Sequence, residues 1–137
     1  MKKSGVIIAA ALILTIIIGG YLAFDSVFPK AAPIQTPTID NIISISIIQN
    51  DNTSVEMGKD NFNQVLEYLE QALPTRKMSV NDYPSVRPYY MTVINTNERE
   101  YRYFVYIEDG YVHIEIPYEG IYKSEQQFYD LIEQYYK

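Results

Sequence analysis

Twenty consecutive residues from Gly5 to Phe24 carry no charge, and this run constrains what the chain can fold into more than any other feature. A helix rises about 1.5 Å per residue, so this length spans about 30 Å, the thickness of the hydrocarbon core of a bilayer. Lys2 and Lys3 precede the run, and Asp25 follows it. This charge asymmetry predicts a single-pass anchor in the cell membrane, with a cytoplasmic N-terminus and an extracellular C-terminal domain.

A cleaved secretory signal is the alternative interpretation of this segment. Such a signal has an apolar core of about 7–15 residues and ends at a small-x-small cleavage site. The run in this chain is longer, and Pro33 disfavours cleavage after residues 30–32. We therefore expect an uncleaved anchor over residues 1–28, which enters the membrane through residues 5–24, followed by a proline-rich stalk over residues 29–38.

Charge and cysteine content restrict the remaining domain, which we expect over residues 39–137. From Ala31 onward the chain has 8 Lys and Arg against 16 Asp and Glu, a net charge of −8. Phosphate backbones and anionic head groups repel such a domain, so we set aside nucleic-acid binding and peripheral membrane binding. Because the chain has no cysteine, its domain must form an ordinary hydrophobic core without disulfides. An exported chain without cysteine is typical of a Gram-positive surface.

Five segments show the patterns of β-strands. Residues 41–49 alternate isoleucine with serine, and residues 54–57 return after turn residues at 50–52. Residues 89–96, 101–108 and 111–118 are rich in tyrosine and β-branched side chains. Asp-Gly at positions 109–110 predicts a tight hairpin between the last two strands.

Two segments show helical spacing. Asp60 is the expected N-cap of the first helix, which Pro74 ends, and Ser124 begins the second in a capping box. Their apolar faces consist of Phe62, Val65, Leu66, Leu69 and Leu73, and of Phe128, Leu131, Ile132 and Tyr135. The order β-β-α-β-β-β-α predicts an α+β fold: one antiparallel sheet of about five strands with two helices on one face, preceded by the transmembrane helix.

Two blocks of sequence, Leu73–Pro84 and Ile116–Tyr122, resemble a family of small exported or membrane-anchored Firmicutes proteins that is catalogued as a domain of unknown function. The resemblance covers residues 38–136. It implies an anchored or secreted Gram-positive domain, and it brings no catalytic residue to this chain.

Residues that carry chemistry are scarce. His113 is the only histidine, and the alternation of its strand places it with Tyr111 and Glu115 on the side that we expect to face solvent. No nucleophile motif accompanies it. One histidine, no cysteine and scattered carboxylates also match no zinc or calcium site. We therefore predict no catalytic residue, no metal and no cofactor.

The connector after the first helix holds the one local cluster of positive charge, formed by Arg76, Lys77 and Arg87 around Asp82. Arginine suits carboxylate or phosphate groups, so the connector is a candidate site for an acidic peptide or a cell-wall polymer. The alternative is that Asp82 forms internal ion pairs with these arginines, which would hold a long loop in place.

Tyrosine is unusually frequent, with fourteen residues and no tryptophan. Tyrosines on the expected sheet favour a protein or glycan interface, although tyrosine also has high strand propensity and could simply cover a half-buried sheet. Tyr118 and Tyr122, in an expected turn over residues 118–122, complete the candidate partner-binding residues.

Three functions remain open. The first is a binding or regulatory module with a protein or cell-wall partner. The second is a structural accessory subunit of a membrane complex, in which mutations of Gly19 and Gly20 would have larger effects than mutations in the connector. The third is a carboxylate-based hydrolase, which a cleft joining Asp82, Glu119 and Tyr122 around a carboxyl group of raised pKa would favour.

Overall fold

The chain forms two compact units in a computed structural model that describes residues 2–50 and 53–137. The first unit spans Met1–Lys30 and the second spans Ala31–Lys137. The expected turn at 50–52 falls partly on residues 51–52, which lie outside the described part.

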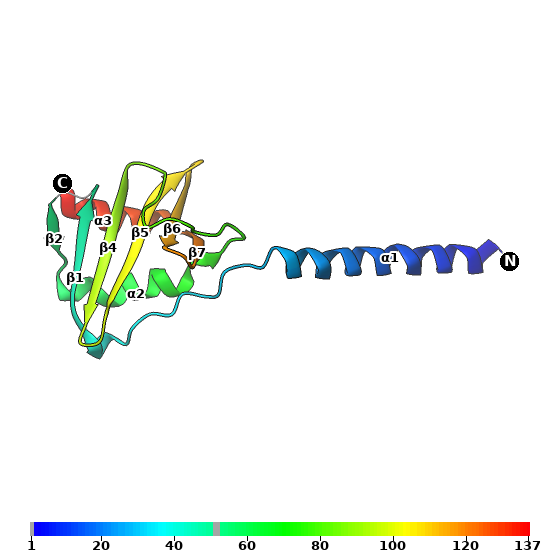
Figure 1. Cartoon of the computed structure of the whole chain (residues 1–137), viewed down its shortest axis with the longest axis horizontal. Helices are drawn as coiled ribbons and strands as arrows, with labels where there is room; N and C mark the ends of the chain where they lie inside the picture. Colours follow the sequence, from blue (N-terminus) through cyan, green and yellow to red (C-terminus); the bar gives the residue numbers. More distant parts are fainter. Residues whose placement is uncertain (1, 51–52) are drawn as a thin grey trace. The chain divides into compact units, whose positions relative to one another are not determined.

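The first unit consists of helix α1 (Lys2–Val27), which contains the uncharged run (Figure 1). Its stretch Ser4–Val27 is 24 residues long and apolar enough to cross a membrane, and none of its apolar window is buried in protein. A helix long and apolar enough for the predicted single-pass anchor is therefore present at the expected residues.

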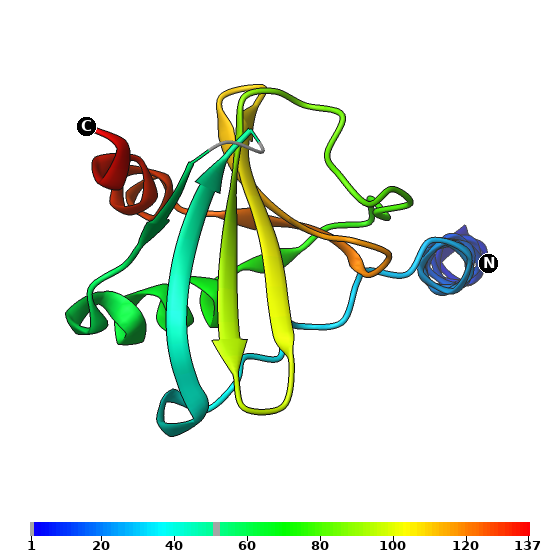
Figure 2. The same cartoon turned by 60° about the vertical axis from the view of Figure 1, so that its left-hand side comes forward.

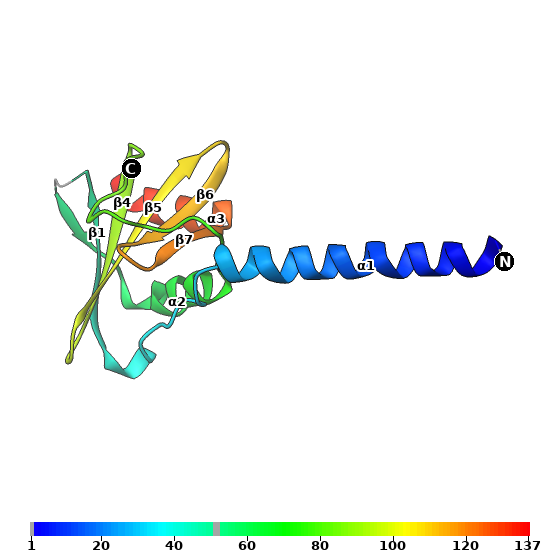
Figure 3. The same ribbon diagram turned by 45° about the vertical axis from the view of Figure 1, so that its right-hand side comes forward.

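The second unit is a seven-stranded, wholly antiparallel sheet with two α-helices (Figures 1 and 3). The strand order is β2-β1-β4-β5-β6-β7-β3. The strands are β1 (Ile42–Gln49), β2 (Ser54–Glu56), β3 (Leu73–Pro74), β4 (Tyr89–Thr96), β5 (Glu100–Glu108), β6 (Tyr111–Ile116) and β7 (Gly120–Ser124). The helices are α2 (Phe62–Gln71) and α3 (Gln126–Glu133), with short 3-10 turns at Ile39–Asn41, Lys59–Asn61 and Gln134–Tyr136.

Both helices of this unit pack on one face of the sheet and close the main hydrophobic core. Val65 and Leu69 of α2 and Phe128 and Ile132 of α3 are fully buried against that face. The strands contribute alternate residues to it, as the period of two requires. These are Ile45, Ile47, Tyr90, Ile94, Tyr103, Val105, Val112, Ile114 and Tyr122. The expected two-layer α+β arrangement is confirmed.

The structure corrects the number of strands, seven rather than about five. Pro74, expected to end a helix, lies in β3 beside Tyr122 of β7, and Gly120–Tyr122, expected in a turn, belong to that strand. Leu73 is consequently a strand residue that is exposed rather than part of the helical face. Proline and glycine are strand breakers in general, but both residues here lie in short strands at one side of the sheet.

Three local predictions also differ from the structure. Asp60 lies in a 3-10 turn and Asn61 occupies the N-cap of α2, while Glu125 rather than Ser124 occupies that of α3. Ile43 is exposed because the β1–β4 register shifts between Ile42 and Ser44. The hairpin at residues 109–110 is confirmed, with φ values of 53° and 78° that suit a tight type I′ turn.

The segment from Ala31 to Thr38, expected to be part of a stalk, lies against the domain. Ile34 is buried, the Tyr122 hydroxyl donates a hydrogen bond to the Ala32 carbonyl oxygen at 2.7 Å, and the Ala31 amide donates to the Thr75 carbonyl oxygen at 3.3 Å. The compact unit therefore begins at Ala31 rather than at residue 39.

A substitution at Gly120 tests whether the N-terminal segment packs against the domain. A Cβ atom at Gly120 would lie 2.5 Å from the Ala31 Cβ, so we expect Gly120→Ala to displace the segment and lower the free energy of unfolding by about 1–3 kcal/mol. Gly58→Ala is the matched control, because nothing lies within 4 Å of a Cβ built there. Chemical denaturation of both variants measures the difference, and equal stabilities would mean that the segment is not docked.

Candidate functional site

The connector, residues 75–88, crosses the face of the sheet opposite the helices (Figure 3). A second buried cluster of Tyr89, Phe104 and Tyr106 lies on that face, with Val86 of the connector packed against it. The ring of Tyr83 meets Phe104 edge-on at 5.6 Å between centroids. The connector therefore covers an aromatic patch rather than projecting into solvent.

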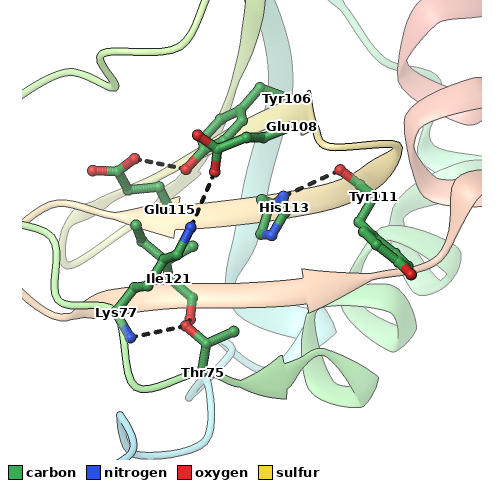
Figure 4. Close-up of polar contacts among 8 residues, drawn as sticks. All are labelled: Thr75, Lys77, Tyr106, Glu108, Tyr111, His113, Glu115 and Ile121. Atoms are coloured by element: carbon green, nitrogen blue, oxygen red, sulfur yellow. Dashed lines mark hydrogen bonds and ion pairs between the residues drawn. The ribbon is translucent and has the colours of Figure 1, made fainter.

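A buried polar cluster joins the connector to β5 and β6. Ser79 donates a hydrogen bond to one oxygen of the Glu115 carboxylate at 2.6 Å, and the Tyr106 hydroxyl donates to the other at 3.1 Å. Figure 4 shows Tyr106 and Glu115 meeting beside His113. The His113 ring stacks on Tyr106 at 5.7 Å. Since Glu115 and Ser79 are both buried, these bonds fix the middle of the connector to the sheet.

His113 was expected on the solvent side of β6, and this prediction is wrong because the side chain is only 5% exposed. The connector covers the face on which it lies. Its Nδ1 lies 3.1 Å from the Tyr111 carbonyl oxygen, which can only accept, so Nδ1 carries the hydrogen. Burial lowers the pKa of His113, and burial together with the Glu115 charge raises the pKa of Tyr106.

Several of the predicted partner-binding residues hold the connector within the domain. The Lys77 ammonium lies 3.3 Å from a Glu108 carboxylate oxygen (Figure 4). The Lys77 carbonyl oxygen accepts a hydrogen bond from the Ile121 amide at 3.1 Å. Arg87 lies over the Tyr89 ring at 5.3 Å from its centroid. Arg76 is half-buried at the start of the connector. These contacts favour the alternative in which the connector is held in place.

Asp82, in the middle of the connector, lies close to Tyr118 and shares a cleft with Tyr122. The Tyr118 hydroxyl donates to an Asp82 carboxylate oxygen at 2.8 Å, which replaces the expected ion pair between Asp82 and an arginine. Tyr118 is exposed, whereas Tyr122 is buried with its hydroxyl bonded to Ala32. Asp82 and Tyr122 both line a cleft at this place.

The cleft has a volume of about 1080 Å³ and lies between β5 and the β6–β7 hairpin. One wall is the segment Arg99–Tyr103, and the other consists of Ile116, Pro117, Glu119 and Tyr122. Asp82 and Tyr83 of the connector and Ala32, Pro33 and Gln35 of the N-terminal segment complete the lining. All of these residues belong to the second unit.

The cleft forms because the pairing of β5 with β6 stops short of the N-terminal end of β5. Their pairing runs from Glu108 opposite Tyr111 to Phe104 opposite Glu115, and β6 ends at Ile116. Pro117 follows and has no amide hydrogen for a further ladder bond. In Figure 2, β6 and β7 turn away from the direction of β1, β4 and β5. The first residues of β5 therefore have a strand neighbour on the β4 side only.

Both signs of charge line the cleft. Arg99 lies over the Tyr101 ring at 4.2 Å from its centroid, and Arg102 Nε lies 2.5 Å from a Glu100 carboxylate oxygen. Burial, with a contribution from the charge of Glu119, raises the pKa of Tyr103 and of Tyr122. Aromatic rings and guanidinium groups are the side chains that dominate protein interfaces. Among residues 2–50 and 53–137, no group of three or more His, Asp or Glu could hold a metal ion.

The cleft thus combines predicted and unpredicted residues. Of the six predicted partner-binding residues, Asp82 and Tyr122 line it, and Tyr118 contacts it through Asp82. Of the wall Arg99–Tyr103, residues 101–103 were predicted to lie in a strand, and Arg99 and Glu100 were not singled out. The tyrosines on or beside the sheet include both buried and exposed side chains. Those of Tyr89, Tyr90, Tyr103, Tyr106 and Tyr122 are buried, whereas those of Tyr111 and Tyr118 are exposed.

The buried histidine predicts a pH dependence of stability. Because the pKa of His113 is lowered in the folded state from its ordinary 6.5, the unfolded chain binds a proton more readily as the pH falls below about 6.5. The contribution of His113 to the free energy of unfolding is fully present above that pH and is lost progressively below it. We expect the free energy of unfolding to fall between pH 7.5 and 5.5, and to fall much less in His113→Gln. Parallel pH profiles for the two proteins would contradict this role.

Comparisons with known proteins agree with the fold and the resemblance. The DUF5301 family model, described as "Domain of unknown function (DUF5300)", matches residues 30–123, which include both blocks that suggested such a family. The solved "NMR structure of the protein from Ruminococcus gnavus" is similar, with 30% identity and a TM-score of 0.61 over 73% of this chain and 99% of that chain. No curated protein matches the chain. The family match spans well over half of the 137 residues, and the chain belongs to the DUF5301 family.

Proposed function

We propose that this protein is a membrane-anchored binding module of a Gram-positive cell surface, and that the cleft beside β5 is its binding site. The observation that carries the proposal is the cleft itself, with tyrosine and arginine side chains on a wall that has a neighbouring strand on the β4 side only. A concave site with a few convergent polar groups is the usual form of a ligand site.

The position of the domain follows from the anchor. Helix α1 is long and apolar enough to span a bilayer, and Lys2 and Lys3 precede its uncharged run. The positive-inside rule then favours a cytoplasmic N-terminus and an extracytoplasmic domain. The net charge of −8 from Ala31 onward disfavours anionic polymers as ligands and favours neutral or basic ones.

The chemistry of the lining favours binding over catalysis. The cleft does bring Asp82, Glu119 and Tyr122 together, which is the arrangement that a carboxylate hydrolase would need. However, Asp82 already accepts a hydrogen bond from Tyr118, and the Tyr122 hydroxyl donates to a backbone carbonyl oxygen. Both groups are thus used to hold the walls together, and the described lining contains no serine, threonine, cysteine or histidine as a nucleophile or base.

Photo-crosslinking in native cells tests the proposal. A benzophenone amino acid at Gln35, which is exposed in the lining, is expected to capture a partner. The same group at Glu125, exposed at the start of α3 and outside the lining, is the control position. Replacing Arg99 and Tyr101 together by alanine removes the stacked pair of the wall and should weaken capture at least tenfold, about 1.4 kcal/mol or more.

Two results would overturn the proposal. One is the absence of any Gln35-specific adduct, with the protein present at normal levels in the membrane. The other is an adduct of equal yield with and without the Arg99 and Tyr101 side chains, which would place the contact outside the cleft.

A further inference from the structure

We infer that the ligand of the cleft is an extended peptide segment, neutral or basic in charge, which pairs as an additional β-strand with the free edge of β5. This inference rests on the proposed function, because it names the class of ligand for the same cleft. It depends on the direction of individual backbone groups in β5.

The hairpin between β4 and β5 fixes that direction. The Thr96 amide donates to the Arg99 carbonyl oxygen at 3.1 Å, so these two residues form a hydrogen-bonded pair. Hydrogen-bonded and non-hydrogen-bonded pairs alternate along antiparallel strands. Tyr101 and Tyr103, opposite Ile94 and Thr92, therefore bond to β4.

The intervening residues of β5 direct their amide and carbonyl groups to the other side. Phe104 and Tyr106 use these groups to pair with Glu115 and His113 of β6. Glu100 and Arg102 have the same direction, but the β5–β6 pairing ends at Phe104. Among the described residues, no backbone partner faces Glu100 or Arg102 on the cleft side.

The chain itself does not fill this edge. If the β5–β6 register continued past Phe104 and Glu115, Arg102 would lie opposite Pro117. Pro117 has no amide hydrogen to donate. Tyr118 then turns the chain away with a φ of 62°. The N-terminal segment at the base of the cleft contains Pro33, which also lacks a donor.

Backbone groups two residues apart repeat at about 6.6 Å, the spacing at which a paired strand presents its own groups. A free edge of this kind is a template for an extended peptide. Tyr101 and Tyr103 lie on the helix side of β5, and Glu100 and Arg102 lie on the connector side. A bound strand would therefore place alternate side chains against tyrosines and against Asp82 and Tyr83.

The charge of the occupant follows from the same residues. Asp82, Glu100 and Glu119 outnumber Arg99 and Arg102 in the lining, and the second unit as a whole has a net charge of −8. Arg102 is also paired with Glu100. An acidic peptide would be repelled, whereas a neutral or basic peptide would be attracted.

Arg102 offers a test that separates backbone from side chain. Arg102→Pro removes the amide hydrogen that faces the cleft and keeps every bond to β4, while Arg102→Ala removes the side chain and keeps the amide. The probe is a random 12-residue peptide library displayed on phage and selected on the full-length protein in lipid nanodiscs, with empty nanodiscs as counter-selection. We expect the synthetic peptide selected on wild type to bind Arg102→Ala within about threefold and Arg102→Pro about tenfold more weakly.

A second measurement applies if Arg102→Pro fails to fold. Single backbone N-methyl groups are placed along the selected peptide, and binding to the wild-type protein is measured. Strand pairing predicts losses of about tenfold at every second position and little change between them, since only alternate amides face β5.

The outcomes separate the two proposals. Equal affinities of the two Arg102 variants, or N-methyl effects without alternation, would overturn strand pairing and leave a binding cleft of another kind. Failure to select any peptide would overturn the peptide inference, while a Gln35-specific adduct in cells would still support the proposed function. The absence of that adduct would remove both.

Discussion

The β5–β6 ladder ends at the pair Phe104–Glu115, and the rest of the site depends on this ending. On the paired side, the Glu115 carboxylate accepts hydrogen bonds from Ser79 and Tyr106, which hold the connector over the sheet. Beyond it, Pro117 removes the next donor, and β6 leaves β5. The connector therefore covers the sheet where β5 and β6 are paired, and the cleft lies where their pairing has ended.

The connector links these two consequences. Its Lys77 carbonyl oxygen bonds to β7 and its Asp82 to Tyr118, so it reaches the hairpin that forms one wall of the cleft. The N-terminal segment supports the same hairpin from the other side through Tyr122 and Gly120. The cleft is thus built on a scaffold that is held at several points, and a preformed site loses less entropy on binding.

Local patterns in the sequence predicted most of the fold. The alternation of isoleucine and serine, the Asp-Gly turn and the spacing of leucines identified β1, the β5–β6 hairpin and α2, because each depends on neighbours in sequence. Strands β3 and β7 were missed, since a two-residue strand has no period and glycine and proline favour turns. His113 was placed in solvent because alternation distinguishes the faces of a strand but not which loop covers them.

Only part of the candidate site was predicted, because a sequence pattern does not show which segments lie next to a strand. Asp82 and Tyr122 were selected for their chemistry, whereas Arg99–Tyr103 followed a normal strand pattern, and Tyr101 and Tyr103 were considered only among the many tyrosines of the sheet. The available signal was Pro117 inside the expected strand 111–118, because proline within a strand indicates that its ladder stops there. To infer from Pro117 that the start of β5 is unpaired, one must also know that β5 lies next to β6.

Amide-resolved hydrogen exchange of the full-length protein in nanodiscs tests the central claim most directly, because it reports each backbone donor of β5. If the ladder ends where described, the amides of Tyr101 and Tyr103 exchange slowly, and those of Glu100 and Arg102 exchange roughly a hundredfold faster. Protection of the Arg102 amide equal to that of Tyr103, with no ligand present, would show that this edge of β5 is already paired and would contradict the account.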